Sequence, residues 1–484
     1  MPARTGQQYI DGLREHPKEV WIRGERVDDV TVHPAFRNGV RSLAALYDMQ
    51  HAPDLRETMT FPSPTSGEPV GLSFIIPRTR EELERRSRMM TQWAWGTCGM
   101  MARSPDFLNV TLSGWAAAAE YFGENRPEFQ QNVKQYHQFI RDGDLTLTHT
   151  LVNLQGSRNP TVVDTLSEEV ALTVIKETDA GIIVRGSRIL ATLGPLSDEI
   201  AVYPTRTHLM PEEAWRQSFA FAIPSDTPGL KFLCRESFDL DRSPFDHPLG
   251  SRFEEMDCLV FFDDVLVPWE RVFLLGDVDR CNNYGAATHS TVHSGHQVLT
   301  RSVVKTEFLL GVASLMVEIL GSTKIPHVQE RVGEIILYLE VLKACLRAAE
   351  ADASLDQWGV MLPAQAPQSA GRGLFARMIY PRMTEIIQLL GSGSLMALPS
   401  EADFETPLGP EIGRYLATDA ASARERVQLF HLAWDMACSA FGGRQTLYER
   451  YFGGDPVRNT IMLYDSYNKE PAMQRVREFL EREE

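Results

Sequence analysis

The chain has 484 residues, of which 43% are hydrophobic and 23% are charged, and its formal net charge at pH 7 is -17. This length allows about two to four domains, and the composition is that of a globular protein with a large apolar core. The excess of 65 acidic over 48 basic residues argues against a protein that wraps nucleic acid or binds anionic lipid through bulk charge.

The sequence carries no sign of export or of a membrane span. The first ten residues lack the apolar core of a signal peptide, and the longest apolar stretch, Phe308–Leu320, is too short to cross a bilayer and contains Glu318. The six cysteines are dispersed and form no Cys-x-x-Cys pair. We therefore expect a cytoplasmic protein with reduced thiols and no metal site.

Residues 5–147 have mainly helical periodicity. The segment Arg37–Met49 places apolar residues at helical spacing, and residues 20–26 predict a small hairpin embedded in the helices. Ser104-Pro105-Asp106 is a strong helix start, with Ser104 as the N-cap residue and Asp106 in the first turn.

From residue 148 to about 275 the pattern changes to short strands punctuated by Gly and Pro. The predicted strands are residues 170–175, Ile182–Val184, Ile189–Thr192, Ile200–Tyr203, Phe219–Ile223, Leu230–Cys234 and Cys258–Val267. This number and spacing of strands predict a compact β barrel or sandwich.

Long helices return after residue 285 and predict a four-helix bundle. The predicted helices are Val298–Leu320, Val328–Ala349, Gly371–Leu390 and Arg414–Phe441. Pro381 is expected to kink or break the third of them. Residues 472–484 predict a charged amphipathic helix that forms a solvated tail or packs on a neighbour.

The chain thus divides into an N-terminal mainly helical domain (1–147), a middle β domain (148–280) and a C-terminal helical bundle with a tail (281–484). This is an α+β fold whose order of parts resembles the acyl-CoA dehydrogenase class. In that class a flavin lies between the β domain and the helices. Because a shared fold does not by itself imply a shared function, this resemblance concerns the fold alone.

Two polar residues next to these elements are candidates for chemistry. Arg103 lies just before the helix start, where a planar guanidinium can hold a phenolate or carboxylate oxygen; the alternative is an Arg paired with a surface acid. His149 lies between Thr148 and Thr150 at the entry to the β region and can act as acid, base or phenol ligand near neutral pH. The alternative for His149 is a half-buried strand residue bonded to the backbone.

A third candidate is the group His289, His293 and His296 at the start of a helix. No cluster of acidic residues accompanies these histidines, so a metal site is not expected. A hydrogen-bonded histidine at a helix entry is the plain alternative.

Segments distributed over the whole chain resemble, in order, the large (oxygenase) subunit of the two-component 4-hydroxyphenylacetate 3-monooxygenase family. These segments are Arg4–Ile10, His33–Asn38, Arg103–Asn109, Thr148–Asn153, Glu177–Val184, Ala191-Thr192, Pro248–Phe253, Val267–Glu270, Leu398–Ser400 and Phe441–Arg444.

The resemblance implies an activity and partners. A separate reductase supplies reduced FAD, which reacts with O₂ to give a C4a-hydroperoxyflavin, and a phenolic substrate takes the distal oxygen ortho to its hydroxyl group. The phenol is either free or tethered to a carrier protein. The protein has to exclude water and hold the ring close to the flavin. The family also implies a homotetramer, a dimer of dimers, in which neighbouring subunits complete the cofactor site.

The same resemblance assigns the substrate residues. Arg103 and His149 would bind the phenol oxygen, Thr205 would lie on the substrate side, and His293 would assist the phenol. Phe107 stands where the family has Tyr, and the missing hydroxyl would cost about 1.5–3 kcal/mol if nothing replaced its hydrogen bond. Either another donor replaces it, or the substrate differs from 4-hydroxyphenylacetate.

For FAD, the resemblance points to two segments of the β region and to one of two glycine-containing segments near the C-terminus. The β-region residues are His149, Thr150, Leu151, Gln155, Gly156, Ser157, Arg158 and Thr192. The C-terminal residues are Gly443 and Arg444, or Tyr451, Phe452, Gly453 and Gly454. A helix end explains either Gly-Gly pair equally well.

Other functions remain open on the sequence. An acyl-CoA dehydrogenase would need a bundle glutamate as base, and the candidates are Glu307, Glu318, Glu334 and Glu340. A 4-hydroxybutyryl-CoA dehydratase would need cluster cysteines where this chain has Ala102 and Thr300, so that iron–sulfur cluster cannot form. A non-catalytic flavin-binding homologue is the third alternative, against which Arg103 and His149 argue.

Overall fold

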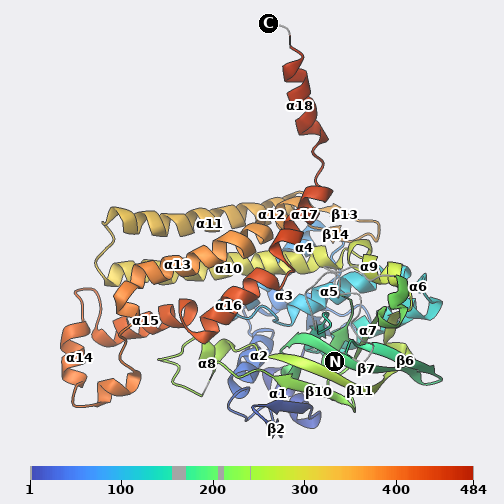
Figure 1. Cartoon of the computed structure of the whole chain (residues 1–484), viewed down its shortest axis with the longest axis horizontal. Coiled ribbons are helices and arrows are strands. Elements are labelled where there is room, and N and C mark those ends of the chain that lie inside the picture. The colour runs from blue at the N-terminus through green and yellow to red at the C-terminus, as the bar shows by residue number, and fades with distance from the viewer. Residues whose placement is uncertain (1–2, 155–169, 205–211, 240, 483–484) are drawn as a thin grey trace.

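The structure is a computed structural model that describes residues 3–154, 170–204, 212–239 and 241–482. Figure 1 shows long helices stacked along one side, two β-sheets at one end of the other side, and a C-terminal helix that projects away from the body. The apolar core is continuous through the helical and β parts.

The N-terminal segment is mainly helical, as predicted. Its helices are α1 (Gly6–Glu15), α2 (Arg37–Met49), α3 (Arg56–Met59), α4 (Arg80–Gly96), α5 (Asp106–Ala117), α6 (Ala119–Gly123) and α7 (Pro127–Gly143). The predicted helix Arg37–Met49 is confirmed, and its apolar stripe is buried. The predicted N-cap role of Ser104 is wrong, because α5 begins at Asp106 and the Ser104 hydroxyl donates to the Asp106 carboxylate at 2.6 Å.

The larger sheet has six strands in the order β2-β1-β10-β11-β7-β6. They are β1 (Glu19–Ile22), β2 (Glu25–Val27), β6 (Thr173–Thr178), β7 (Gly181–Thr192), β10 (Leu230–Cys234) and β11 (Asp257–Pro268). The predicted hairpin β1–β2 exists, but it extends this sheet, because β1 pairs parallel with β10. The two strands predicted at 182–184 and 189–192 form the single strand β7.

The smaller sheet has the order β12-β9-β8-β5. Its strands are β5 (Leu147–Thr150), β8 (Glu199–Val202), β9 (Phe219–Pro224) and β12 (Val272–Leu275). The two sheets pack through apolar faces, and the rings of Phe221 on β9 and Phe262 on β11 meet edge to face at 6.4 Å. Two further hairpins are β3–β4 (Thr60–Pro62, Pro69–Gly71) and β13–β14 (Ser354–Leu355, Met361–Leu362).

The C-terminal segment forms the helical layer. Its helices are α9 (Val278–Ala287), α10 (Ser290–Ile319), α11 (Pro326–Ala351), α12 (Gln365–Leu374), α13 (Tyr380–Gly391), α14 (Gly409–Leu416), α15 (Ala423–Ala437), α16 (Ala440–Tyr451), α17 (Pro456–Ser466) and α18 (Glu470–Leu480), and the short α8 (Gly250–Phe253) precedes them. A π-helical turn, Phe375–Ile379, joins α12 to α13 just before Pro381, and the backbone stays helical at both junctions. The helix is therefore distorted near Pro381 but does not break there. One continuous helix over Arg414–Phe441 is wrong, because Ser422 and Ser439 cap two new helices there.

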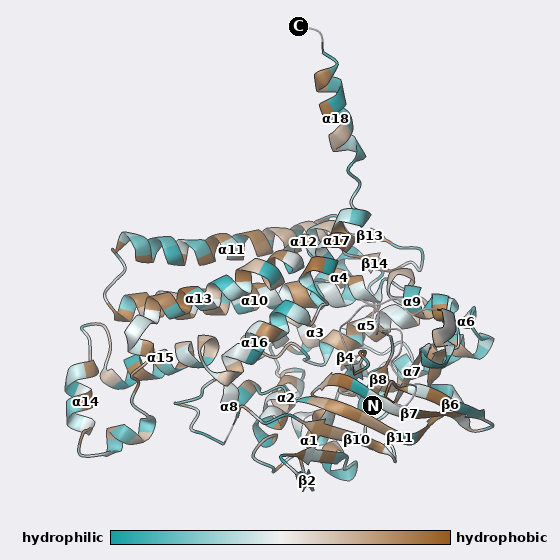
Figure 2. Ribbon diagram, in the orientation of Figure 1, coloured by the Kyte–Doolittle hydropathy of each residue, from teal (hydrophilic) through white to brown (hydrophobic). Residues whose placement is uncertain are grey.

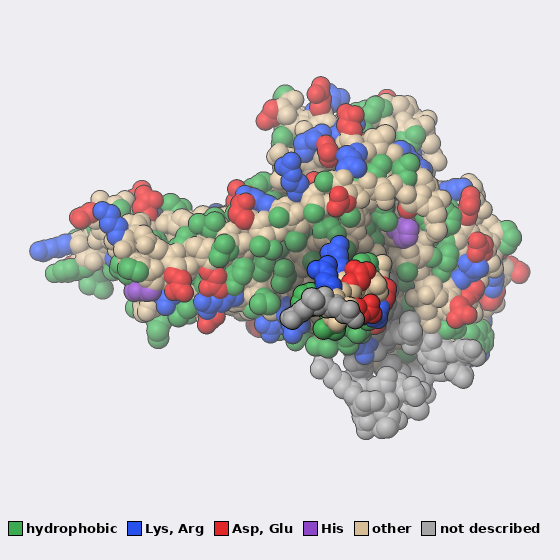
Figure 3. All heavy atoms as spheres, turned by 90° about the horizontal axis from the view of Figure 1, so that it is seen from above, with side chains coloured by type: hydrophobic (Ala, Val, Ile, Leu, Met, Phe, Trp, Pro, Cys, Tyr) green, Lys and Arg blue, Asp and Glu red, His purple; other side chains and the backbone are tan. Residues whose placement is uncertain are grey.

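The last helix stands apart from the body. Figure 2 shows brown and teal residues alternating along α18, and its apolar side chains Met473, Val476, Phe479 and Leu480 are exposed. In Figure 3, which views the face from which α18 projects, a hollow lies beside that helix. In the described part of the chain, no helix combines the length and apolar character needed to cross a membrane. The domain boundaries at 147/148 and 280/281 stay predictions.

Candidate active site

Arg103 precedes α5 and is buried against an aromatic ring. Its guanidinium carbon lies 3.9 Å from the centroid of the Phe107 ring, and the rings of Phe452 and Tyr448 lie at 5.3 and 5.6 Å. Only 8% of Arg103 is exposed, and its Nε and Nη1 have no hydrogen-bond partner among the described residues. A surface ion pair does not fit this burial. Because unpaired buried N–H groups are costly, the arrangement favours the binding of an anion or a polar ligand.

His149 lies on β5, where all four residues of the strand are buried. Its Nδ1 is 2.5 Å from the Tyr203 hydroxyl, and its ring meets the Phe107 ring at a right angle with the centroids 5.7 Å apart. Burial lowers the pKa of His149 well below its ordinary value, and the positive charge of Arg103 lowers it further. His149 is therefore a neutral imidazole beside a cation, and its partner is a hydroxyl rather than the backbone.

A buried ion network joins the predicted segments. Arg444 donates from Nε and Nη2 to Asp257 at 2.9 and 2.8 Å, and from Nη1 to Glu255 at 2.8 Å. Glu255 in turn accepts the backbone N–H of Arg103 at 2.7 Å. Asp257 also accepts the Thr192 hydroxyl at 2.8 Å. Arg103 before α5, Thr192 on β7 and Arg444 on α16, which were predicted separately, thus lie in one connected cluster.

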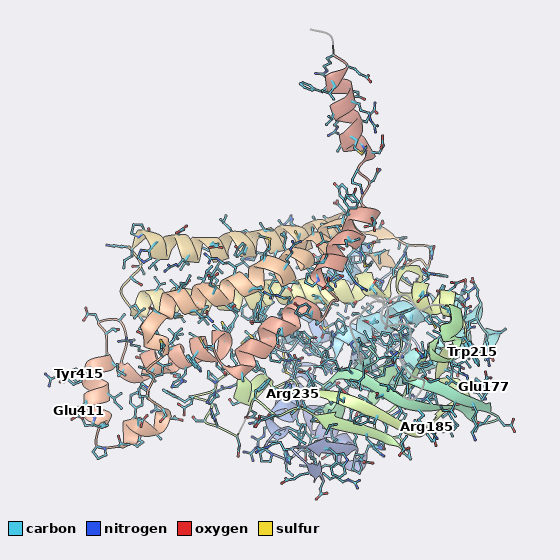
Figure 4. All side chains as sticks on the ribbon, viewed as in Figure 1. Glu177, Arg185, Trp215, Arg235, Glu411 and Tyr415 are labelled. Atoms are coloured by element: carbon cyan, nitrogen blue, oxygen red, sulfur yellow. The ribbon has the colours of Figure 1, made fainter. Side chains whose placement is uncertain are left out.

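A second arginine shares the carboxylate at the centre of this network. Arg235, labelled in Figure 4, follows β10 and donates to Asp257 at 3.0 Å and to Glu254 at 2.6 Å. Burial raises the pKa of Asp257, but the guanidiniums of Arg444 and Arg235 outweigh it and hold that pKa below its ordinary value. Asp257 is therefore ionised and fixes the two cations.

Helix α16 places both predicted C-terminal segments near Arg103. Arg444, Tyr448 and Phe452 follow each other at intervals of four residues, so they share one face of the helix. The Tyr448 and Phe452 rings are stacked with centroids 4.8 Å apart. The two segments are therefore not exclusive, although Tyr451 itself is exposed.

The remaining predicted cofactor residues lie at the end of β5. The Thr150 hydroxyl donates to the backbone of Ile189 at 3.2 Å, and the carbonyl of Leu151 accepts a bond from Arg188. Burial lowers the pKa of Arg188 to about 10, and its Nε has no partner among the described residues. Gln155, Gly156, Ser157, Arg158 and Thr205 lie outside the described residues.

His293 occupies a different environment from Arg103 and His149. Its Nδ1 accepts a bond from Arg86 at 3.1 Å, and burial and then Arg86 lower its pKa well below the ordinary value. Within the described ranges no hydrogen bond joins His293 to Arg103 or His149. His289 and His296 pair separately with Asp356 and Glu350, both at 2.9 Å. The described residues contain no group of three or more His, Cys, Asp or Glu that could hold a metal ion.

The glutamates considered as a dehydrogenase base lie elsewhere. Glu307, Glu318 and Glu340 are exposed, and Glu334 is paired with Arg382 at 2.9 Å.

A surface cleft of about 780 Å³ is lined in part by Arg126 and by Glu177 and Trp215, the last two labelled in Figure 4. None of the predicted site residues that the structure describes lines it. Among the described residues, predicted site residues from several elements meet in the buried cluster around Arg103, which is therefore the candidate active site.

Several residues of this cluster were missed by the sequence reasoning. They are Arg188, Tyr203, Glu255, Asp257 and Tyr448. Arg188 gave only a weak signal, because the same strand also carries Ser187 and the exposed Arg185. Glu255 and Asp257, which flank Met256, gave no signal of burial, because two acidic residues at this spacing are typical of a surface loop.

Two family profiles together cover almost the whole chain. Residues 5–274 match "4-hydroxyphenylacetate 3-hydroxylase N terminal" and residues 281–481 match "4-hydroxyphenylacetate 3-hydroxylase C terminal". The chain belongs to the 4-hydroxyphenylacetate 3-hydroxylase family. The resemblance inferred from the sequence is thereby confirmed.

Individual relatives agree with this assignment. The chain is 48% identical to the 4-hydroxyphenylacetate 3-monooxygenase oxygenase component of Thermus thermophilus, over 99% of this chain and 97% of that protein. It is also similar, at a TM-score of 0.94 and 48% identity, to the crystal structure of such an oxygenase component complexed with FAD and 4-hydroxyphenylacetate, which covers 99% of this chain and 98% of that one.

Two more distant structures bear on the fold alone. A 4-hydroxybutyryl-CoA dehydratase from N. maritimus has a TM-score of 0.85 at 18% identity and covers 96% of this chain and 92% of that one. A glutaryl-coenzyme A dehydrogenase has a TM-score of 0.51 at 11% identity and covers 86% and 87%. The predicted acyl-CoA dehydrogenase-like α+β fold is confirmed.

Proposed function

We propose that the chain is the oxygenase component of a two-component flavin monooxygenase, which uses reduced FAD and O₂ to hydroxylate a phenolic substrate ortho to its hydroxyl group. A separate reductase would supply the reduced FAD. The observation that carries this proposal is the pairing of a buried, unsatisfied Arg103 guanidinium with a neutral His149 around the Phe107 ring. Family membership supports the same activity.

The described residues fit FAD. A flavin ring carries hydrogen-bond acceptors and its diphosphate is anionic, so both need N–H donors. Arg188 has an unpartnered buried N–H group, and a side chain added at Gly443 would meet no described residue within 4 Å. We propose that Thr150, Leu151 and Thr192 contact the flavin. When bound in its reduced form, FAD would supply the two electrons that activate O₂; one oxygen atom of O₂ would go to the substrate and the other would leave as water.

The C-terminal residues are proposed to have two different roles, one in positioning other residues and one in contacting the site or FAD. Arg444 directs Nε, Nη1 and Nη2 at carboxylates, so we propose that it holds Thr192 and Arg103 in place through Asp257 and Glu255. Phe452 would cover the same side of the site as Tyr448, and Gly443, Tyr451, Gly453 and Gly454 are proposed as backbone contacts to FAD.

The chain's own residues account for substrate binding and orientation. The Arg103 guanidinium would bind the phenol oxygen through its fork of donors and favour the phenolate, whose ortho carbon is the more electron-rich. The neutral His149 ring would hold the same oxygen without adding a second positive charge. Phe107 would pack against the substrate ring and, with Tyr448 and Phe452, exclude water. Thr205 is proposed on the substrate side and His293 as an assisting residue.

The proposed substrate class is a phenol, because Arg103 and His149 are the residues that would bind a phenol oxygen. Phe107 offers that oxygen no hydroxyl, and the phenol is proposed as either free or tethered to a carrier protein. A panel of both kinds, incubated with reduced FAD from a generic flavin reductase, tests the proposal. A catechol product from any member supports it. Consumption of O₂ with no hydroxylated product from any member refutes it.

We also propose that the chain works in the cytoplasm as a homotetramer, a dimer of dimers. The exposed apolar side chains on the projecting helix α18 support a contact between chains (Figure 2), since such a face is stabilised when it is buried. Light scattering on the purified chain tests this, and a monomer at micromolar concentration refutes it.

A further inference from the structure

Tyr203 is held rigidly beside His149. It directly follows β8, whose residues pair in parallel with β5, so that Thr150 lies opposite Val202. The Tyr203 ring packs edge to face on Trp115, with the centroids 5.1 Å apart, and on Tyr284 at 5.8 Å. Only 4% of Tyr203 is exposed, and its hydroxyl oxygen lies 2.5 Å from His149 Nδ1.

We propose that Tyr203 is a positioning residue: its hydroxyl donates to His149 Nδ1 and thereby fixes the tautomer in which Nε2 carries the proton and donates to the phenol oxygen of the substrate. The second half of this statement rests on the proposed function. The first half concerns the free protein and stands independently of it.

The direction of the hydrogen bond follows from the chemistry of the two groups. His149 is neutral, because burial and the nearby Arg103 charge both lower its pKa, and a neutral imidazole carries a proton on one ring nitrogen only. A phenol is a good donor and a poor acceptor, whereas an unprotonated imidazole nitrogen is a good acceptor. The short O···N distance therefore favours a hydrogen bond in which the Tyr203 hydroxyl donates to an unprotonated Nδ1 of His149.

The other ring nitrogen is left available. Nε2 of His149 makes no hydrogen bond to a residue that the structure describes, and the ring stands at 90° to Phe107. With Nδ1 engaged, the proton on Nε2 has no competing acceptor in the described cluster. Because ring orientation and tautomer are set by the partner of the other nitrogen, Tyr203 determines what His149 can offer a substrate.

This arrangement also bears on the hydroxyl group that Phe107 lacks. The aromatic hydroxyl beside His149 comes from Tyr203 at the end of β8 and acts through His149, whereas α5 offers no hydroxyl at Phe107 to touch the substrate directly. Rings of Phe107, His149 and Tyr203 follow one another with centroids 5.7 and 5.5 Å apart. The phenol oxygen would thus receive bonds from Arg103 and from His149 Nε2.

The test is nitrogen NMR on the full-length protein labelled with ¹⁵N-histidine, with the His149 signals assigned from their loss in His149→Gln. We expect an unprotonated Nδ1 and a protonated Nε2 in the wild type, and a mixture of tautomers in Tyr203→Phe. Tyr284→Phe is the matched control: it removes a buried hydroxyl from the same ring cluster, but that hydroxyl bonds to the Pro204 carbonyl at 2.9 Å. Its His149 signals should match the wild type.

Phenol binding is the second readout, measured by calorimetry with 4-hydroxyphenylacetate and oxidised FAD. Tyr203→Phe should weaken it about fivefold, which corresponds to ~1 kcal/mol, while Tyr284→Phe should not. A protonated Nδ1 in the wild type overturns the proposal without any variant, even if Tyr203→Phe does not fold. Wild-type tautomer and affinity in Tyr203→Phe also overturn it. If the wild type binds no phenol but has the expected tautomer, the proposed function fails and the Tyr203 assignment remains.

Discussion

Asp257 offers the sharpest test of the buried network. The substitution Asp257→Asn keeps the size of the side chain and removes the charge that Arg444 contacts at 2.9 and 2.8 Å and Arg235 at 3.0 Å. Breaking a buried ion pair costs about 3–5 kcal/mol. Arg444 keeps Glu255 and Arg235 keeps Glu254, so the lower end, ~3 kcal/mol, is the expected loss in the free energy of unfolding.

The matched control is Asp264→Asn on the same strand. Asp264 pairs with Arg185, labelled in Figure 4, and both side chains are about half exposed to solvent. Exposed pairs contribute little, so this variant should unfold like the wild type. Urea unfolding followed by tryptophan fluorescence measures both, and binding of reduced FAD should weaken in Asp257→Asn alone. Equal stability of the two variants would refute the assignment of Asp257 as the centre of the network.

Three further predictions concern the site and its pH dependence. Arg103→Met should raise KM for a phenol about ten- to hundredfold, since a hydrogen bond to a charged group contributes ~1.5–3 kcal/mol; an unchanged KM would remove Arg103 from substrate binding. Phe107→Tyr should lower KM for small phenols about fivefold through one added hydrogen bond of ~1 kcal/mol, and no change would mean that Arg103 and His149 suffice. Burial, and then Arg141, lower the pKa of His137 from 6.5 to about 4, so the unfolded chain binds a proton that the folded chain does not. The free energy of unfolding should therefore fall by up to ~3 kcal/mol between pH 6.5 and 4, and the same pH slope in His137→Gln would contradict this cause.

The periodicity of apolar residues predicted the helices and strands well, but it predicted poorly which strands pair with one another. The apolar spacing of residues 37–49 gave the bounds of α2, because a helix buries one stripe of its own residues. The hairpin at 20–26 was recognised, but its pairing with β10 was not. Strand patterns indicate which face is buried, while the choice of neighbour depends on contacts more than 200 positions away. The single helix expected over residues 414–441 failed because local serine caps outweighed a continuous apolar pattern.

The site shows the same division. Arg103 and His149 were candidates from their local sequence, Thr192 and Arg444 were named from a resemblance to a family, and the structure brings the four into one cluster. Their connection through Glu255 and Asp257 could not be foreseen, because an acidic residue in a loop is usually solvated. Only the burial of these carboxylates against two guanidiniums turns them into structural anchors.

Helix α16 explains how the cluster is held on both sides. One face carries Arg444, Tyr448 and Phe452 toward Arg103, and the other carries Glu449 into the bundle. The Glu449 carboxylate is fully buried and binds Arg301 at 2.6 and 2.8 Å and Lys305 at 2.7 Å on α10. Burial raises the pKa of Glu449, but these two cations outweigh it and lower that pKa to about 2.

Buried ion pairs of this kind add little net stability compared with apolar packing, but removing one partner is costly. We infer that their value here is geometric. A shift of α16 by one turn would separate Glu449 from Arg301 and Arg444 from Asp257 at the same time, leaving charges buried at both ends. The register of the helix is therefore fixed from two directions, and with it the distance between the stacked Tyr448 and Phe452 rings and the guanidinium of Arg103.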